Sequence, residues 1–393
     1  MHGILFRLKF KLCAVLSLAL LFSSTAAYAE LSAAADAKTS AQLINAKSGI
    51  LMEASTGEVL YEQNADERLP IASVTKTMTM LLIMEALDEG KISLNDTVTV
   101  SEYAASMGGS QVFLEVGEQM SADDMLKAIA VASGNDAAVA MAEFVSGSEG
   151  AFVEKMNKRA AELGCTNTHF INCNGLDETD EHYSTARDVA LISRALISHK
   201  KIFDYTTIWM DSLRGGSFGL SNTNKLIRFY KGANGLKTGS TSTAKYCLSA
   251  TAERDGMQLI AVIIAAPTTA DRFSSASALL DFGFANFDAV GEGFTDLPAP
   301  YVRVTGGISE QTAPKINGDG FIVKKGCRDR IETRFELAES VDAPLTKGQK
   351  LGEVIYTVDG IEAARRDVCA DEDIPRINLM QMFIRNLNDW ITL

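Results

Sequence analysis

Two β-hairpin patterns lie far apart in this chain, and together they constrain its fold more than any other feature. The first spans residues 44–61 and the second residues 237–264. Helical patterns fill most of the chain between them, and one more helix is expected over residues 272–282. A hairpin, helices, a second hairpin and a final helix predict an α+β fold, in which helices pack on an antiparallel sheet.

The most apolar of the expected helices runs on from Met78, and a serine and a lysine stand directly before it. Ser73 and Lys76 are three residues apart, so on a helix the amine can reach the hydroxyl. A hydroxyl beside an amine in apolar surroundings is a candidate activated nucleophile. The S-x-x-K pattern alone is weak, because it also occurs at Ser198/Lys201 and Ser242/Lys245.

Two further short motifs follow in order along the chain. Ser133-Gly-Asn135 stands at the end of a helix expected from about Ser121, and Lys237-Thr-Gly239 enters a buried strand. Taken singly, Ser133-Gly-Asn135 fits an ordinary helix end and Lys237-Thr-Gly239 fits a charged residue on an edge strand. Each pattern, as S-x-N or K-S/T-G, also occurs elsewhere in the chain. The three motifs in this order and in these local settings are far more specific than any one of them.

With these motifs the sequence resembles the penicillin-recognising serine acyltransferases. Within them it is most similar to the low-molecular-mass penicillin-binding proteins that are D-alanyl-D-alanine carboxypeptidases. The resemblance covers roughly residues 40–290 and includes segments outside the motifs, among them 113–118, 174–177, 183–188 and 283–284. It implies a β-lactamase/transpeptidase-like domain, followed by a small β-domain and a C-terminal amphipathic helix.

The resemblance implies catalytic roles for four residues. Ser73 attacks the peptide carbonyl, and a neutral Lys76 accepts its proton. Burial and the positive charge of Lys237 would both favour the neutral amine. Ser133 passes a proton to the leaving amine, and Asn135 orients Lys76 and the substrate amide.

The remaining implied residues bind the substrate, which is the stem peptide of peptidoglycan. Lys237, Thr238 and Arg272 would hold its terminal carboxylate, and Gly239 belongs to the same motif. Backbone N–H groups of Ser73 and Ser240 would form an oxyanion hole. Thr223 stands where many relatives carry an arginine.

Composition narrows the partners and cofactors. The chain has 37 basic and 50 acidic residues and a net charge of −13, which argues against nucleic-acid binding by bulk electrostatics. Its four histidines show no metal-ligand spacing, so the sequence predicts no metal and no cofactor. The cysteines after Cys13 are odd in number and form no disulfide framework, although a Cys165–Cys173 pair stays open.

The ends of the chain predict export and membrane attachment. Residues 1–29 have the basic start, apolar stretch and small-residue cleavage site of a secretory signal; the alternative is an uncleaved anchor. We expect a catalytic domain over 30–290, a small β-sandwich-like domain over 291–372 and an amphipathic helix over 373–393. The predicted location is the outer face of the cytoplasmic membrane.

The last segment has apolar residues at steps of three and four, from Ile374 through Ile377, Phe383 and Trp390. Such a stripe indicates either a helix packed on the β-domain or an in-plane membrane anchor. The family ends in this way, which favours the anchor.

Rival functions use the same motifs. A serine β-lactamase needs a dedicated base, typically a glutamate in an E-x-x-L-N loop, and no such string lies between Ser133 and Lys237. A penicillin-sensing domain would belong to a receptor with transmembrane helices, and only the signal is apolar enough here. A D,D-endopeptidase would use the same site and stays open. For the carboxypeptidase, β-lactams are expected to acylate Ser73 as inhibitors.

Overall fold

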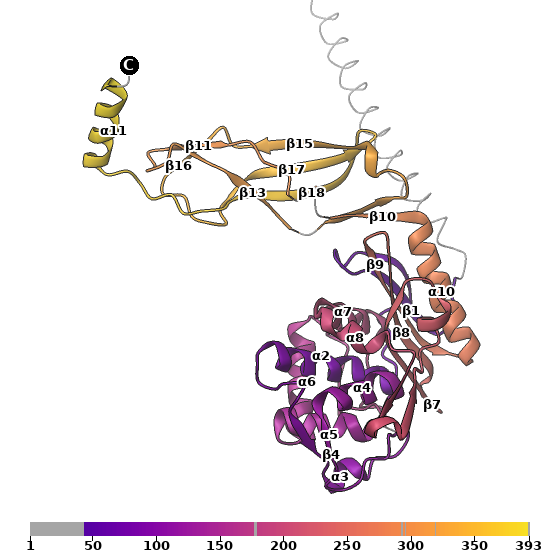
Figure 1. Ribbon diagram of the computed structural model, residues 1–393. Helices are drawn as coiled ribbons and strands as arrows, with labels where there is room; N and C mark the ends of the chain where they lie inside the picture. Colours follow the sequence, from indigo (N-terminus) through magenta and orange to yellow (C-terminus); the bar gives the residue numbers. More distant parts are fainter. Residues whose placement is uncertain (1–42, 177–178, 292–293, 295, 319, 392–393) are drawn as a thin grey trace, which may run out of the picture. The chain divides into compact units, whose positions relative to one another are not determined.

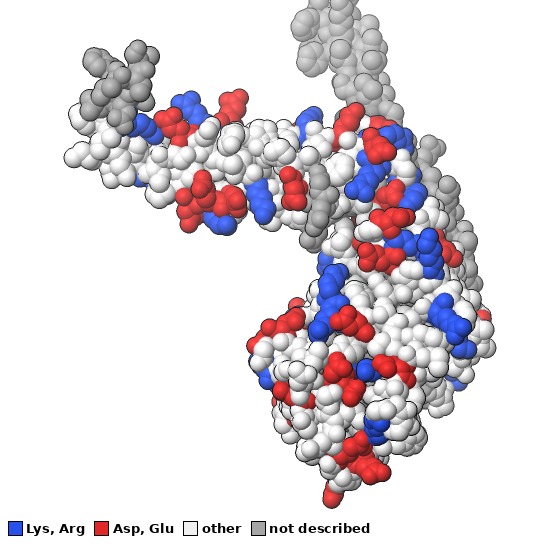
Figure 2. All heavy atoms as spheres, viewed as in Figure 1, with Lys and Arg blue, Asp and Glu red and all other residues white. Residues whose placement is uncertain are grey.

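The computed structural model describes residues 43–176, 179–291, 294, 296–318 and 320–391, with the backbone alone for residues 386–391. The expected export signal and its cleavage site therefore lie outside the described residues. Figure 1 shows the order of the elements: helices and a sheet as far as α10 (Thr269–Asn286), then short strands, then α11 (Leu379–Ile391). On the face visible in Figure 2, acidic and basic side chains are interspersed.

The central sheet has five antiparallel strands in the order β2-β1-β9-β8-β7. They are β1 (Ser48–Glu53), β2 (Val59–Gln63), β7 (Ala233–Thr241), β8 (Lys245–Arg254) and β9 (Met257–Ala266). The two hairpins expected from the sequence are confirmed, and they join because β1 pairs with β9. Strand β9 is apolar and buried along nearly its whole length, since helices cover both faces of the sheet (Figure 1).

Helix α2 (Lys76–Asp88) is the centre of the helical layer. Its residues are apolar on all sides, which is the pattern of a helix buried all round. It packs against α4 (Ala122–Ala132), α5 (Asn135–Ser146), α6 (Glu149–Glu162) and α7 (Ala186–Ser198). The expected helices at α2, α4, α6, α7 and α10 are confirmed, and Ser121 caps α4 by accepting a hydrogen bond from the Asp124 N–H.

Ser73 lies just ahead of α2 in a 3₁₀ turn, η1 (Ala72–Thr75). A 3₁₀ turn has three residues per turn, so residues i and i+3 lie on the same side. The expected shared face of Ser73 and Lys76 is therefore confirmed, although the serine is not part of the α-helix itself. We call residues 72–76 the serine turn.

The Gly, Asn and Ser content of residues 211–236 predicts mostly loop, but the structure has regular elements there. Strands β5 (Met210–Leu213) and β6 (Phe218–Ser221) pair as a hairpin, and a helical turn, α9 (Leu226–Phe229), precedes β7. The glycines that suggested a loop form the tight turn, where Gly215 and Gly216 have positive φ. Other short elements are β3 (Thr97–Thr99), β4 (Gln119–Ser121), α3 (Glu102–Ala105) and α8 (Phe203–Thr206).

The expected small β-domain is also found. Its two larger sheets have the orders β12-β11-β16 and β13-β18-β17-β15, and β10 pairs with β14. Two apolar clusters pack between these strands. One surrounds Tyr356 and the other surrounds Val302. The strands are β10 (Phe287–Val290), β11 (Val302–Thr305), β12 (Gln311–Thr312), β13 (Pro314–Asn317), β14 (Phe321–Lys324), β15 (Ile331–Leu337), β16 (Ser340–Asp342), β17 (Lys350–Val358) and β18 (Ile361–Ala370).

The C-terminal helix begins later than the apolar stripe suggested. Ile374 is buried and forms a β-bridge with Leu345, so its side chain belongs to the β-domain core. Helix α11 starts at Leu379, and its residues Leu379, Met380 and Phe383 are 85%, 69% and 65% exposed. Among the described residues, no helix combines the length and apolar character needed to cross a membrane.

Candidate active site

Lys76 is fully buried, and its amine is held by three oxygen atoms. Nζ lies 2.9 Å from Ser73 Oγ, 2.6 Å from Asn135 Oδ1 and 2.7 Å from the Asn174 carbonyl oxygen. An ammonium group has three donors, so each of them has an acceptor here. The first two motifs thus meet at one nitrogen atom.

The surroundings of Lys76 favour the neutral amine. Burial lowers the pKa of Lys76 to about 7, and the nearby Asp136 carboxylate opposes this shift. The Asp136 carboxylate accepts hydrogen bonds from the backbone N–H groups of Val112, Leu114 and Ala137 and does not contact the amine. A lysine with this pKa can accept a proton at neutral pH.

The S-G-N motif forms the junction between two helices. Ser133 ends α4 in a left-handed conformation, and Asn135 is the first residue of α5. The Asn135 amide donates to the Gly108 carbonyl at 2.7 Å, which leaves its oxygen facing Lys76. Within the described residues the Ser133 hydroxyl makes no hydrogen bond, so it can turn toward a ligand.

The K-T-G motif lies on β7, which is the edge of the sheet. Lys237 is buried, and its Nζ donates to the Thr238 carbonyl at 2.8 Å. A Cβ on Gly239 would lie 2.7 Å from the Ile71 carbonyl and 2.9 Å from the Ser73 nitrogen. Glycine at this position therefore lets the strand lie directly against the serine turn.

Arg272, on the first turn of α10, completes a group of three buried basic side chains with Lys76 and Lys237. Its Nη1 lies 3.3 Å from the Gly239 carbonyl oxygen and 3.4 Å from that of Cys247. Burial lowers the pKa of Lys237 well below its ordinary value, and the charges of Lys76 and Arg272 lower it further. Within the described residues none of the three forms an ion pair, so the site is suited to an anion. Burial, rather than the expected charge of Lys237, is the main reason for the lowered pKa of Lys76.

Two more of the residues predicted to bind substrate lie along the same strand. The Thr238 hydroxyl donates to the Thr223 hydroxyl at 2.7 Å. At the position where the resemblance implies an arginine in many relatives, Thr223 thus contacts the threonine of the K-T-G motif. Ser240 is exposed on β7, one residue beyond Gly239.

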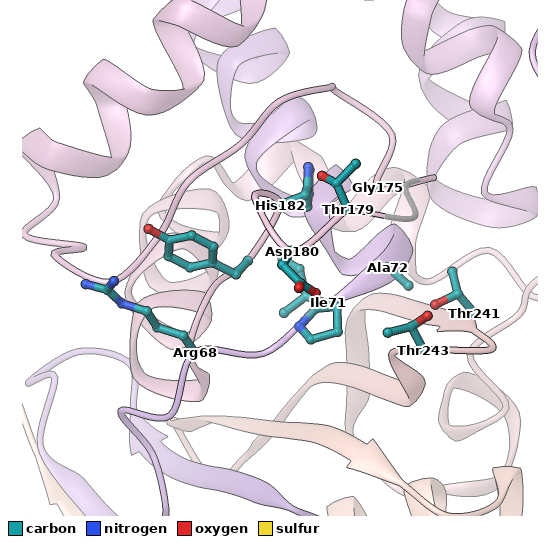
Figure 3. Close-up of a pocket in the computed structure, with 11 residues that line it drawn as sticks. Arg68, Ile71, Ala72, Gly175, Thr179, Asp180, His182, Thr241 and Thr243 are labelled. Carbon is teal, nitrogen blue, oxygen red and sulfur yellow. The ribbon is translucent and has the colours of Figure 1, made fainter.

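A cavity of about 370 Å³ adjoins the serine turn. Figure 3 shows it between Ile71 and Ala72 on one side and Thr241 and Thr243 on the other. Gly175 and His182 reach it from residues 171–176 and 179–183, the described parts of the segment that we call the 171–183 loop. It provides room for a ligand that continues past the end of β7.

Sequence reasoning missed two contacts from the 171–183 loop. The Asn174 backbone carbonyl holds Lys76, and no side-chain pattern reveals a backbone contact. The His182 ring reaches Thr75 within the serine turn.

The five cysteines from Cys165 onward are free and buried. Among the described residues, no group of three or more His, Cys, Asp or Glu side chains is arranged to hold a metal ion.

Family profiles match most of this architecture. The profile described as D-alanyl-D-alanine carboxypeptidase matches residues 35–268. The chain belongs to the D-alanyl-D-alanine carboxypeptidase family. A second profile, described as penicillin-binding protein 5, C-terminal domain, matches residues 309–376. The enzyme is thus a serine hydrolase of the cell wall, and the predicted activity, fold class and extracytoplasmic site of action are confirmed.

Individual relatives agree with the family assignment. The D-alanyl-D-alanine carboxypeptidase DacF of Bacillus subtilis (strain 168) is 44% identical over 364 residues, covering 90% of this chain and 92% of its own. The crystal structure of penicillin binding protein 5 from Haemophilus influenzae has a TM-score of 0.77 at 33% identity, covering 85% and 98%. Penicillin-binding protein D2 from Listeria monocytogenes, in an ampicillin-bound form, has a TM-score of 0.56 at 33% identity, covering 61% and 98%.

Proposed function

We propose that this carboxypeptidase removes the terminal D-alanine of peptidoglycan stem pentapeptides through an acyl-enzyme on Ser73. The observation that carries the proposal is the contact between Ser73 Oγ and Lys76 Nζ. Burial lowers the pKa of Lys76 to about 7. An amine of that pKa accepts the serine proton at neutral pH, which makes the hydroxyl a nucleophile.

Acylation begins when Ser73 Oγ attacks the carbonyl carbon of the penultimate D-alanine. Lys76 takes the hydroxyl proton as the new C–O bond forms. The carbonyl oxygen becomes an oxyanion between the backbone N–H groups of Ser73 and Ser240, where each donor contributes about 3 kcal/mol. The close approach of β7 to the serine turn at Gly239 supports this placement.

Collapse of the oxyanion breaks the C–N bond and releases D-alanine. The proton on Lys76 reaches the leaving amine through the Ser133 hydroxyl, which has no fixed partner among the described residues. Asn135 keeps the Lys76 amine in place during both transfers. Water then attacks the ester carbonyl while Lys76 takes one of its protons. The bond between the carbonyl carbon and Ser73 Oγ breaks, Lys76 returns the proton to Ser73 Oγ, and the shortened peptide leaves.

The terminal carboxylate of the substrate binds to Lys237, Thr238 and Arg272. An incoming carboxylate raises the pKa of Lys237 again, because an opposite charge stabilises the ammonium form. The same carboxylate position is present in penicillin, so β-lactams acylate Ser73 and inhibit the enzyme. The related D2 protein with bound ampicillin supports this extension.

We further propose that the chain is exported by residues 1–29 and divided into domains at 30–290, 291–372 and 373–393, with Ile374 at the start of the last segment still packed in the β-domain core. Within the last segment, α11 lies in the outer surface of the cytoplasmic membrane. Its exposed Leu379, Met380 and Phe383 supply the apolar contact.

The test is release of free D-alanine from a purified stem pentapeptide. The mature enzyme should release it, and Ser73→Ala should lose both this activity and covalent labelling by penicillin. Ser198→Ala is the matched control, since Ser198 also fits S-x-x-K but donates to the Ala195 carbonyl at a helix end. A label on Ser198, or activity in Ser73→Ala, would overturn the assignment.

A further inference from the structure

His182 is buried behind the serine turn, and the proposed mechanism gives it no role. Its Nε2 lies 2.7 Å from the hydroxyl of Thr75, which stands between Ser73 and Lys76. The ring is 3% exposed and Thr75 is fully buried. Figure 3 shows His182 beside Thr179 and Gly175, on the loop that faces the serine turn.

The contacts of the ring fix its tautomer. The backbone N–H of Ile171 donates to Nδ1 at 3.3 Å, and an N–H group can only donate. Nδ1 is therefore the acceptor, so the ring carries a proton on Nε2 and donates it to Thr75. The Phe170 ring meets His182 edge to face, with the centroids 5.7 Å apart, which holds the plane of the imidazole.

The same loop meets the serine turn at two other points. The Asn174 carbonyl accepts from Lys76 Nζ at 2.7 Å. At Gly175 a Cβ would lie 2.0 Å from the Ala72 carbonyl oxygen, so the two backbones are in direct contact. A shift of the loop would move an acceptor of the catalytic amine.

We propose that His182 is a positioning residue that fastens the 171–183 loop to the serine turn through Thr75. It keeps Lys76 Nζ between the Ser73 hydroxyl and the Asn174 carbonyl. This inference rests on the proposed roles of Ser73 and Lys76. A misplacement of about 1 Å in a catalytic group costs on the order of 10²-fold in rate, so His182 acts on the acylation step and not on substrate affinity.

Two substitutions separate the two ends of the ring. His182→Gln puts an amide nitrogen near the place of Nε2 and keeps the donor to Thr75. His182→Asn puts an oxygen near the place of Nδ1, so it keeps the acceptor for Ile171 and loses Thr75. His169→Asn is the matched control, because His169 lies on the neighbouring backbone, is exposed, and bonds to the Glu181 carbonyl.

The measurement is acylation of each purified variant by labelled penicillin over a concentration series, with the thermal midpoint as a check of folding. His182→Asn should lower the saturated rate constant about 10- to 100-fold and leave the half-saturating concentration unchanged. His182→Gln and His169→Asn should acylate at close to the wild-type rate. A normal rate in His182→Asn, or a raised half-saturating concentration at a normal rate, would overturn the proposal.

Thr75→Val supplies an independent arm if His182→Asn fails to fold. It removes the hydroxyl with little change of shape and should slow acylation to a similar degree. The double variant should be no slower than the slower single one, because both changes break the same contact. Additive losses, or a normal rate in Thr75→Val, would count against the proposal. Failure of the wild type to label at Ser73 would instead overturn the proposed function.

Discussion

The start of α2 and the edge strand β7 each place a buried lysine in the same site, but they hold it differently. Lys76 Nζ donates to three oxygen atoms, whereas Lys237 Nζ has one acceptor among the described residues, the Thr238 carbonyl. Burial lowers the pKa of both amines. The two side chains are chemically identical, so the different roles that we propose for them depend on their hydrogen-bond acceptors.

The number of acceptors explains the division of labour. Lys76 has no donor left for a substrate, and its fixed position suits a group that exchanges a proton with Ser73. Lys237 keeps donors for a ligand and lies beside Arg272, so a carboxylate gains most by binding there. On this ground we propose that Lys76 is the base and Lys237 the anion receptor.

The largest expected effect is that of Lys76→Arg. A guanidinium keeps the charge but does not deprotonate, so acylation by penicillin should fall on the order of 10²- to 10⁴-fold. Stopped-flow labelling measures the rate, and Lys237→Arg is the comparator, with a clearly smaller loss expected. An active Lys76→Arg enzyme would remove Lys76 from the role of base.

Lys237→Met should weaken recognition of the substrate carboxylate. A hydrogen bond to a charged group contributes about 1.5–3 kcal/mol, so kcat/KM for the stem peptide should fall roughly 10- to 100-fold. A peptide with a C-terminal amide is the control: the wild type should lose activity on it, and Lys237→Met should lose little more. Equal sensitivity of both enzymes to the amide would place the carboxylate elsewhere.

The pH profile sharpens the comparison further. The neutral amine is the active form of Lys76, so acylation should rise with pH, about tenfold per unit, and level off above about pH 7, the pKa of Lys76. The profile belongs to the coupled site as a whole. Lys237→Met should keep this rising limb, and its disappearance in that variant would assign the titration to Lys237.

The smallest effect on catalysis is expected from removing α11. A mature chain ending at Asn378 keeps the buried Ile374 and should release D-alanine at the full rate, with both lysines behaving as in the wild type. Its binding to lipid vesicles, followed by sedimentation, should be lost. Vesicle binding that persists would mean that α11 is not the anchor.

Much of the site could be predicted because motif order filters out chance matches. Ser198 lies at the end of α7 and Ser242 in the turn before β8, so neither has the setting of Ser73. The β5–β6 hairpin could not be predicted, because each strand has only four residues and the glycine-rich turn between them is typical of a loop. The roles assigned to the site residues, Ser133 and Ser240 among them, stay predictions.

By itself the sequence determined the local chemistry: a serine and a lysine three residues apart must share a side of one helical turn. It also determined which strand carries Lys237, through the hairpin pattern of β7 to β9. Only the tertiary structure decided the pKa of Lys76, because burial comes from helices distant in sequence. It likewise decided that Asn135, Asn174 and His182 converge on the serine turn, since such contacts depend on packing and on backbone atoms that every residue shares.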